Sequence, residues 1–277
     1  MSRLARFSIL FILACTCDAF AGGFSRCWGL KDAKLKANLT RHKSSSGDYI
    51  HTLKTDLLRI AAKTNRGDLA SDAQIESALD LVTQLESMNS TDSNEAEEKK
   101  YSIEGTWDLV FTDAQLFQSS PVFLTIRELY GEDAAKAKQA FNLHRAATNT
   151  GEIGVVQQVI TSSQLISKVN IRNGLIPGVP FSLRGEIIST ADLQILDRYT
   201  MKLTMKETAV EKSNIPFGLG SMLAVASIPV GQLLKAITGK VPECSLNTFY
   251  LDNDLRITRN KDDNVFVYLR GDSSTIL

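Results

Sequence analysis

The sequence is poor in cysteine, in proline and in net charge, and these shortages exclude several classes of protein. Three of its four cysteines (Cys15, Cys17 and Cys27) lie near the N-terminus, so a processed chain would keep only Cys244. That excludes a scaffold held by internal disulfides and a cysteine-based metal site. The 31 Lys and Arg residues balance 31 Asp and Glu residues, so no net field attracts nucleic acid. With six prolines and 43% apolar residues, the composition is that of an ordinary globular protein.

Motifs of catalysis and cofactor binding are missing as well. The sequence has no nucleophile elbow, zinc-binding helix, phosphate loop or paired-carboxylate motif. His144 has no second histidine or cysteine at ligand spacing in its segment. The carboxylates of Asp108, Asp113 and Asp252 are available, but their contexts are typical of turns and barrel rims. We therefore expect a protein that is not an enzyme, with no catalytic residue, no metal and no cofactor.

The first residues have the layout of a targeting leader. Arg3 and Arg6 precede an apolar run, residues 7–14, that is too short to span a bilayer, and small residues follow as far as Ala19. This pattern predicts a secretory signal peptide over residues 1–19.

A second leader follows the first. Asp18-Ala19-Phe20-Ala21 resembles the Ala-Phe junction of two-part plastid leaders in algae with secondary plastids. Residues 20–46 are rich in Lys, Arg and Ser, and Asp32 is their only acid. We therefore predict a transit peptide over residues 20–50 and import into a complex plastid.

Two amphipathic helices are predicted next, over residues 51–92. Leu53, Leu57 and Ile60 have helical spacing, and Asn65-Arg66-Gly67 ends the first helix with a turn that tolerates left-handed backbone. Ser71 and Gln74 form a capping box at the start of the second helix. Two such helices cannot bury their apolar faces alone, so we expect them to pack on the domain that follows. The buried stripe of the second helix would be Ile75, Ala78, Leu79, Val82 and Leu85.

Residues 101–270 show mainly the period of strands. Trp107, Leu109 and Phe111 share one face of a strand that starts at Gly105, and residues 152–160, 164–171 and 197–206 also alternate. Antiparallel strands at short spacing favour a barrel, whose interior could hold a small apolar ligand. Strand parity predicts these lining residues: Leu109, Phe111, Val169, Phe181, Leu183, Tyr199, Met201 and Leu203.

Two segments within this region are harder to assign. Residues 122–126 fit either a strand or a short lid. Residues 215–237 form an apolar insert in which Lys235 is the only charge and Pro229 argues against one regular helix. The insert could be a lid across the barrel mouth, a segment that dips into a lipid surface, or a membrane span. Its contact residues would be Phe217, Leu219, Met222, Leu223, Ile228, Leu233 and Leu234.

Three motifs together resemble the plastid lipid-associated proteins, the PAP/fibrillin family. They are the Asn65-Arg66-Gly67 turn between two helices, the Gly105-Thr106-Trp107 strand, and the C-terminal pair of strands around Leu255-Arg256-Ile257-Thr258-Arg259. The resemblance implies a lipocalin-like antiparallel β-barrel flanked by N-terminal helices and a lid-like insert. It also implies that a late arginine stacks on Trp107, with Arg270 the first candidate and Arg259 the reserve. The family's polar turn after Arg259 contains a glycine, which this chain lacks.

The resemblance implies a plastid lipid-associated binding protein. The chain would bind an apolar lipid, prenylquinone or carotenoid and would associate with the lipid surface of thylakoids or plastoglobules. One alternative is a lipocalin-like isomerase or de-epoxidase that acts on a carotenoid or oxylipin. Another is a structural coat of plastid lipid bodies that binds no ligand.

Overall fold

The computed structural model describes residues 46–91, 102–131, 152–174, 183–197, 200–212 and 227–271, with a few residues between 133 and 142. The predicted signal peptide and most of the predicted transit peptide lie outside these ranges, as do residues 215–226 of the insert. Among the described residues, no helix has the length and apolarity needed to cross a membrane.

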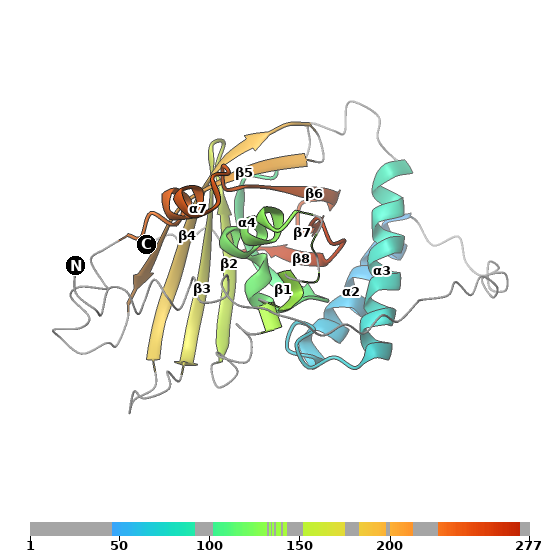
Figure 1. The fold of residues 1–277 in the computed structure, drawn as a ribbon. Coiled ribbons are helices and arrows are strands. Elements are labelled where there is room, and N and C mark those ends of the chain that lie inside the picture. Colours follow the sequence, from blue (N-terminus) through green and yellow to red (C-terminus); the bar gives the residue numbers. More distant parts are fainter. Residues whose placement is uncertain are drawn as a thin grey trace.

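Eight antiparallel strands close in a ring, each paired with the next along the chain (Figure 1). The ring closes where β8 pairs with β1, with Trp107 opposite Arg270. This confirms the predicted antiparallel barrel with N-terminal helices. The strands are β1 (Gly105–Thr112), β2 (Ile153–Ile160), β3 (Gln164–Gly174), β4 (Leu183–Ile195), β5 (Thr200–Glu211), β6 (Glu243–Leu251), β7 (Leu255–Arg259) and β8 (Val265–Arg270).

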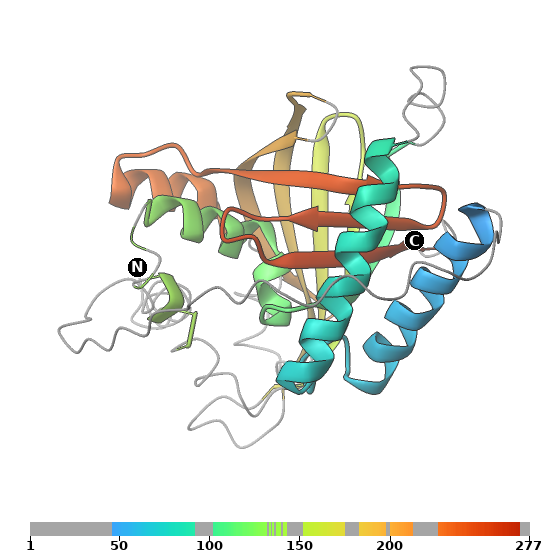
Figure 2. The same cartoon turned by 90° about the vertical axis from the view of Figure 1, so that its right-hand side faces the viewer.

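Two helices, α2 (Ser46–Lys63) and α3 (Asp72–Thr91), pack on the outside of the barrel. Figure 2 shows α3 crossing the outer face of the C-terminal strands. We call β1, β6, β7 and β8 the helix-backed wall, because their outer apolar side chains share one buried cluster with the two helices. We call β2 to β5 the bare wall. Because α2 begins at Ser46, residues 46–50 form its first turn, although the sequence pattern assigns them to the transit peptide. The packed cluster includes Leu57, Val82, Leu85, Phe111, Tyr250, Ile257 and Val267.

The Asn-Arg-Gly turn fastens the helices to the barrel. Gly67 has a φ of +96°, and a Cβ there would lie 2.1 Å from the carbonyl oxygen of Thr112 at the end of β1. The Thr112 N–H donates to the carbonyl of Arg66 (3.0 Å). The Arg66 guanidinium donates to the carbonyls of Ile153 (2.7 Å) and Gly154 (2.5 Å) on β2. Only glycine allows this close approach with a left-handed backbone.

The barrel mouth is covered by the segment Leu116–Leu129, which we call the plug. It consists of a 3-10 turn, η1 (Leu116–Ser119), and a helix, α4 (Pro121–Leu129). Residues 122–126 are therefore helical, and Pro121 suits the first turn of a helix because its missing N–H needs no partner there. Arg127 and Glu128 of the plug form ion pairs with Asp262 and Lys261 in the turn between β7 and β8.

The described part of the apolar insert lies beside the plug. Helix α7 (Val230–Thr238) buries Val230 and Leu234 against Phe117, Val122 and Ile126 of the plug. Ile228 makes an isolated bridge to Thr208 on β5, and Leu233 is half-buried. Phe217, Leu219, Met222 and Leu223 lie outside the described residues.

Candidate ligand site inside the barrel

A large apolar cluster lines much of the inner face of the barrel. Four of the predicted lining residues belong to it: Leu109, Val169, Met201 and Leu203. Each is at most 8% exposed. Leu116 and Leu124 of the plug pack into the same cluster, so the plug reaches into the interior. Phe181 and Tyr199 lie outside the described residues, and Leu183 is placed only as the first residue of β4.

Phe111 does not line the interior. The pairing of β1 with β8 shifts its register between Leu109 and Phe111, and this irregularity reverses the parity of the strand. Phe111 consequently packs between the barrel and the helices, where it is fully buried. The parity prediction fails here because a bulge inserts one residue that alternation does not count.

The two arginines near Trp107 differ in their surroundings. Arg270 is opposite Trp107 on the neighbouring strand, and its Cζ lies 4.2 Å from the ring centroid, which is the stacking that the resemblance implies. Its guanidinium donates to the carbonyls of Ser102, Glu104 and Asn253. A Cβ at Gly105 would lie 2.7 Å from Arg270 Nη1, so a glycine leaves room for the guanidinium. This end of the barrel is thus closed by the Trp107–Arg270 pair.

Arg256 is the residue that the sequence analysis missed. It lies on β7 opposite Tyr268 and is fully buried inside the barrel. Its Cζ is 4.3 Å from the centroid of the Tyr268 ring and 5.2 Å from that of Trp107. Its Nη2 donates to Gln158 Oε1 (2.5 Å), and Gln158 Nε2 donates to the Tyr268 hydroxyl (2.9 Å) and to the Ser119 carbonyl (3.1 Å). One polar cluster therefore links β2, β7, β8 and the plug.

Several hydrogen-bond donors in this cluster have no acceptor among the described residues. Arg256 Nε and Nη1 have no hydrogen-bond partner in that part of the chain, and the same holds for the buried hydroxyls of Ser167, Thr248 and Thr258. Ser167 is paired with Gln158 across the neighbouring strands, and Thr248 is paired with Thr258. Within the described ranges, no carboxylate forms an ion pair with Arg256.

The charge states of the cluster follow from its burial. Burial lowers the pKa of Arg256 to about 10, so the guanidinium stays charged at neutral pH. Burial also raises the pKa of Tyr268 to about 12, so the phenol stays neutral. The polar centre of the barrel therefore carries one positive charge.

Alternation on β7 shows which residues share a face with Arg256, but it does not show that this face is the inner one. In Leu255-Arg256-Ile257-Thr258, the two apolar residues alternate with the two polar ones. The usual rule turns the apolar face inward, but here Leu255 and Ile257 face the helices. A strand with two buried faces breaks the rule that polar residues point to water.

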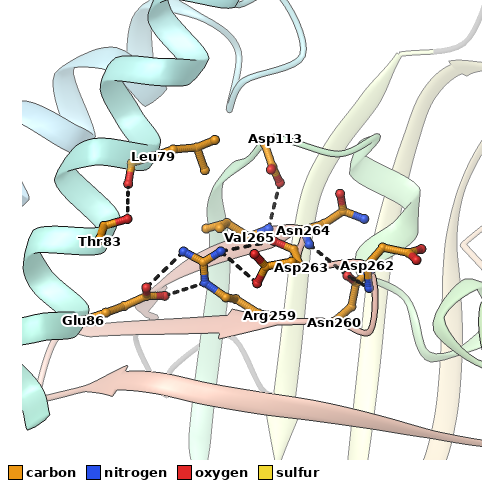
Figure 3. A network of polar contacts seen from close by, with 10 residues as sticks. All are labelled: Leu79, Thr83, Glu86, Asp113, Arg259, Asn260, Asp262, Asp263, Asn264 and Val265. Carbon is orange, nitrogen blue, oxygen red and sulfur yellow. Dashed lines mark hydrogen bonds and ion pairs between the residues drawn. The ribbon is translucent and has the colours of Figure 1, made fainter. Parts of the chain in front are cut away.

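Arg259, the reserve candidate for the tryptophan contact, lies on the outer face and joins α3 to the barrel. It forms two hydrogen bonds with the Glu86 carboxylate, 2.9 and 3.0 Å long, and an ion pair with Asp263 (Figure 3). In the same network, Asp113 accepts from the Val265 N–H at 2.8 Å. The turn lacks glycine, and Asp263 takes the left-handed position with a φ of 63°.

The other groups considered for chemistry have structural partners. Asp108 accepts from Gln157 (2.8 Å), and Asp252 accepts from the backbone N–H groups of its own turn. Cys244 is buried beside Thr125, and burial raises the pKa of its thiol to about 12. His144 lies outside the described residues, within which no three His, Cys, Asp or Glu side chains cluster as metal ligands would.

Comparison with known proteins places the chain in a family. No curated protein and no solved structure matches it. The model of the PAP_fibrillin family matches residues 51–269, from the first helix to the last strand. The chain therefore belongs to the PAP/fibrillin family, whose members are plastid lipid-associated proteins.

Proposed function

We propose that the protein binds one apolar lipid or isoprenoid inside the barrel and associates with thylakoids or plastoglobules. The observation that carries this proposal is the large apolar cluster inside the barrel, together with the separate segment of chain that covers the barrel mouth. An eight-stranded barrel has an interior wide enough for side chains or for one small ligand. The family supports a role with plastid lipids, and the barrel interior is the enclosed apolar surface that such a role needs.

The plug is the part of the molecule that a ligand would have to displace. Leu116 and Leu124 lie in the interior cluster, and the Ser119 carbonyl accepts from Gln158 at its centre. The plug is not one of the hairpins that form the wall, so it can move without opening the strand pairing of the ring. We propose that it swings away from the mouth when the ligand enters.

The apolar insert is proposed to contact the lipid surface. On α7, Val230 and Leu234 face the plug, whereas Ile237 is 57% exposed. Val241, just beyond the helix, is 50% exposed. An apolar face flanked by lysines suits the boundary between headgroups and acyl chains. Because the insert adjoins the plug, contact with lipid could also open the mouth.

The surface contact can be tested by flotation. Replacing Phe217, Leu219, Met222 and Leu223 with serine should reduce co-flotation of the full chain with galactolipid liposomes several-fold. The control replaces exposed Leu69, which lies in the turn between α2 and α3. Undiminished flotation of the fourfold variant would contradict the surface contact.

A binding protein fits the polar cluster better than an enzyme does. Tyr268 has a pKa of about 12, so it would be a poor proton donor near neutral pH. The isomerase or de-epoxidase alternative predicts turnover of a carotenoid or oxylipin that is lost in Tyr268→Phe while binding persists. The coat alternative predicts that no ligand binds in a fixed ratio.

The direct test of the proposed function is native mass spectrometry of the full chain purified from its own cells, followed by lipid extraction. One apolar lipid per chain supports the proposal, whereas a chain that carries and accepts no lipid supports the coat. Fusion of residues 1–50 to a fluorescent reporter tests the location. Secretion of that reporter, in place of import into the plastid, would overturn the plastid assignment.

A further inference from the structure

The buried guanidinium of Arg256 is the least expected feature of the interior. A buried cation normally has a carboxylate partner or a full set of acceptors, because removing a charge from water costs several kcal/mol. In the part of the chain that the structure describes, Arg256 has one acceptor, Gln158 Oε1, for its five N–H groups. An apolar side chain of similar volume would fill the same space without that cost. The arrangement suits a function that uses the charge.

The free donors of Arg256 lie at the edges of its guanidinium plane. The rings of Tyr268 and Trp107 lie within cation–π distance, at 4.3 and 5.2 Å from Cζ. Nε and Nη1 remain for an acceptor, which would have to approach at an edge of the plane. Thr258, two residues along β7, and Thr248 opposite it add hydroxyls that have no partner among the described residues. These groups can all donate to an oxygen atom.

We propose that Arg256 binds the carboxylate of a lipid with a long apolar chain, with Tyr268 and Gln158 holding the guanidinium in place. This inference rests on the proposed function, because it names the class of ligand held in the barrel. The acyl chain would lie along the apolar inner face, in the space that Leu116 and Leu124 of the plug now occupy.

Charge decides between a carboxylate and a neutral oxygen. A quinone carbonyl could accept from Nε or Nη1, but it would leave the single positive charge of the interior without a counterion. A carboxylate provides two oxygen acceptors and neutralises that charge. The attraction between two opposite charges is screened less inside the barrel than in water, so the interior should favour the anion.

The test compares oleate with its uncharged methyl ester, which has the same chain. Dissociation constants for the full chain are measured by isothermal titration calorimetry, with a prenylquinone as the third probe. Oleate should bind at least about tenfold more tightly than methyl oleate, as expected when hydrogen bonds to a charged group are made in a buried site. Arg256→Met should reduce that ratio to about one while methyl oleate still binds.

Two further measurements show whether the preference for oleate arises at Arg256. Arg270→Met removes the other cation that stacks on Trp107, at the closed end of the barrel, and should leave the oleate preference unchanged. In a Trp28→Phe background Trp107 is the only tryptophan, and oleate should change its emission more than methyl oleate does.

The outcomes separate this inference from the proposed function. If methyl oleate or the prenylquinone binds as tightly as oleate, the carboxylate inference is overturned and the proposed function stands. If none of the three probes binds, the proposed function fails as well. The comparison of probes on the wild-type chain decides the matter even if Arg256→Met does not fold.

Discussion

Strands β7 and β8 are buried on both faces, whereas β5 alternates between buried and partly exposed side chains. On the bare wall, most inward residues are apolar, with Gln158 and Ser167 as polar exceptions, and the outward ones include lysines such as Lys202 and Lys206. On β7, the apolar residues face the helices, and Arg256 faces the interior. The helices thus allow a strand to turn its polar face inward, and a polar site can form inside an apolar barrel.

The largest expected effect is on the free energy of unfolding. It tests whether the outer face of the helix-backed wall is packed as a second hydrophobic core. Ile257→Ala should lower the free energy of unfolding by about 2–5 kcal/mol, because a fully buried side chain leaves a cavity. Val155→Ala on β2 should change it by less than about 0.5 kcal/mol, because Val155 is 52% exposed. Urea denaturation of both variants gives the comparison. Equal losses would show that the two walls do not differ.

The next largest loss of stability is expected at the Asn-Arg-Gly turn, which joins the helices to the barrel. Gly67→Ala should cost about 2–3 kcal/mol, because it combines a left-handed backbone with a Cβ 2.1 Å from the Thr112 carbonyl oxygen. Gly131 has a φ of +60°, and no atom of the described residues lies within 4 Å of its Cβ position, so Gly131→Ala should cost only about 1 kcal/mol. Thermal unfolding of the pair separates the clash from the backbone strain. If Gly67→Ala and Gly131→Ala are equally stable, the contact between Gly67 and the Thr112 carbonyl oxygen does not require a glycine.

A smaller effect is expected for the ion pair between α3 and β7. Arg259→Met should cost about 2 kcal/mol, because Glu86 loses both hydrogen bonds at a site where each side chain is only 15% exposed. Lys206→Met on the bare wall should cost less than about 0.5 kcal/mol, since its pair with Asp192 is about half exposed. Urea denaturation at low and high salt distinguishes the two variants. High salt should abolish the loss of stability in Lys206→Met but not the loss in Arg259→Met.

The smallest effect concerns pH. Burial alone would raise the pKa of Asp252, but hydrogen bonds from Lys54 of α2, from Tyr250 and from two backbone N–H groups outweigh it and lower the pKa below 3.8. A carboxyl with a lowered folded pKa stabilises the protein above its unfolded pKa, and that stability is lost as the pH falls through the folded pKa. Asp252→Asn should therefore be less stable than wild type at pH 7, and the difference should shrink below pH 3.8.

Asp254→Asn is the matched control, because its carboxylate is 79% exposed and lies 3.9 Å from the same lysine. It should follow the wild-type pH profile. A constant difference between Asp252→Asn and wild type from pH 7 to pH 3 would contradict the assigned role of Asp252.

The sequence predicts the bare wall better than the helix-backed wall for a physical reason. Alternation identifies the interior when one face meets water, and it puts Val169, Met201 and Leu203 on the face that belongs to the interior cluster. It fails at Phe111, because a bulge shifts the parity, and it does not mark Arg256, because both faces of β7 are buried.

The plug shows a different limit of the sequence. Residues 122–126 are apolar and rich in β-branched side chains, which suits a strand as well as a buried helix. Tertiary packing favours the helix, because the segment buries some residues against α7 and others in the barrel interior. The family resemblance supplies the Trp107–Arg270 contact, which alternation alone does not predict.

The claim that the ligand enters the barrel past the plug can be tested with one disulfide. Thr125 Oγ1 on the plug lies 3.7 Å from Cys244 Sγ on β6, so Thr125→Cys should form a disulfide with Cys244 that holds the mouth shut. Cys15, Cys17 and Cys27 are replaced by serine to prevent other pairings. We predict that the oxidised full chain takes up no oleate, methyl oleate or prenylquinone and that reduction restores uptake. Equal uptake before and after reduction would contradict the account.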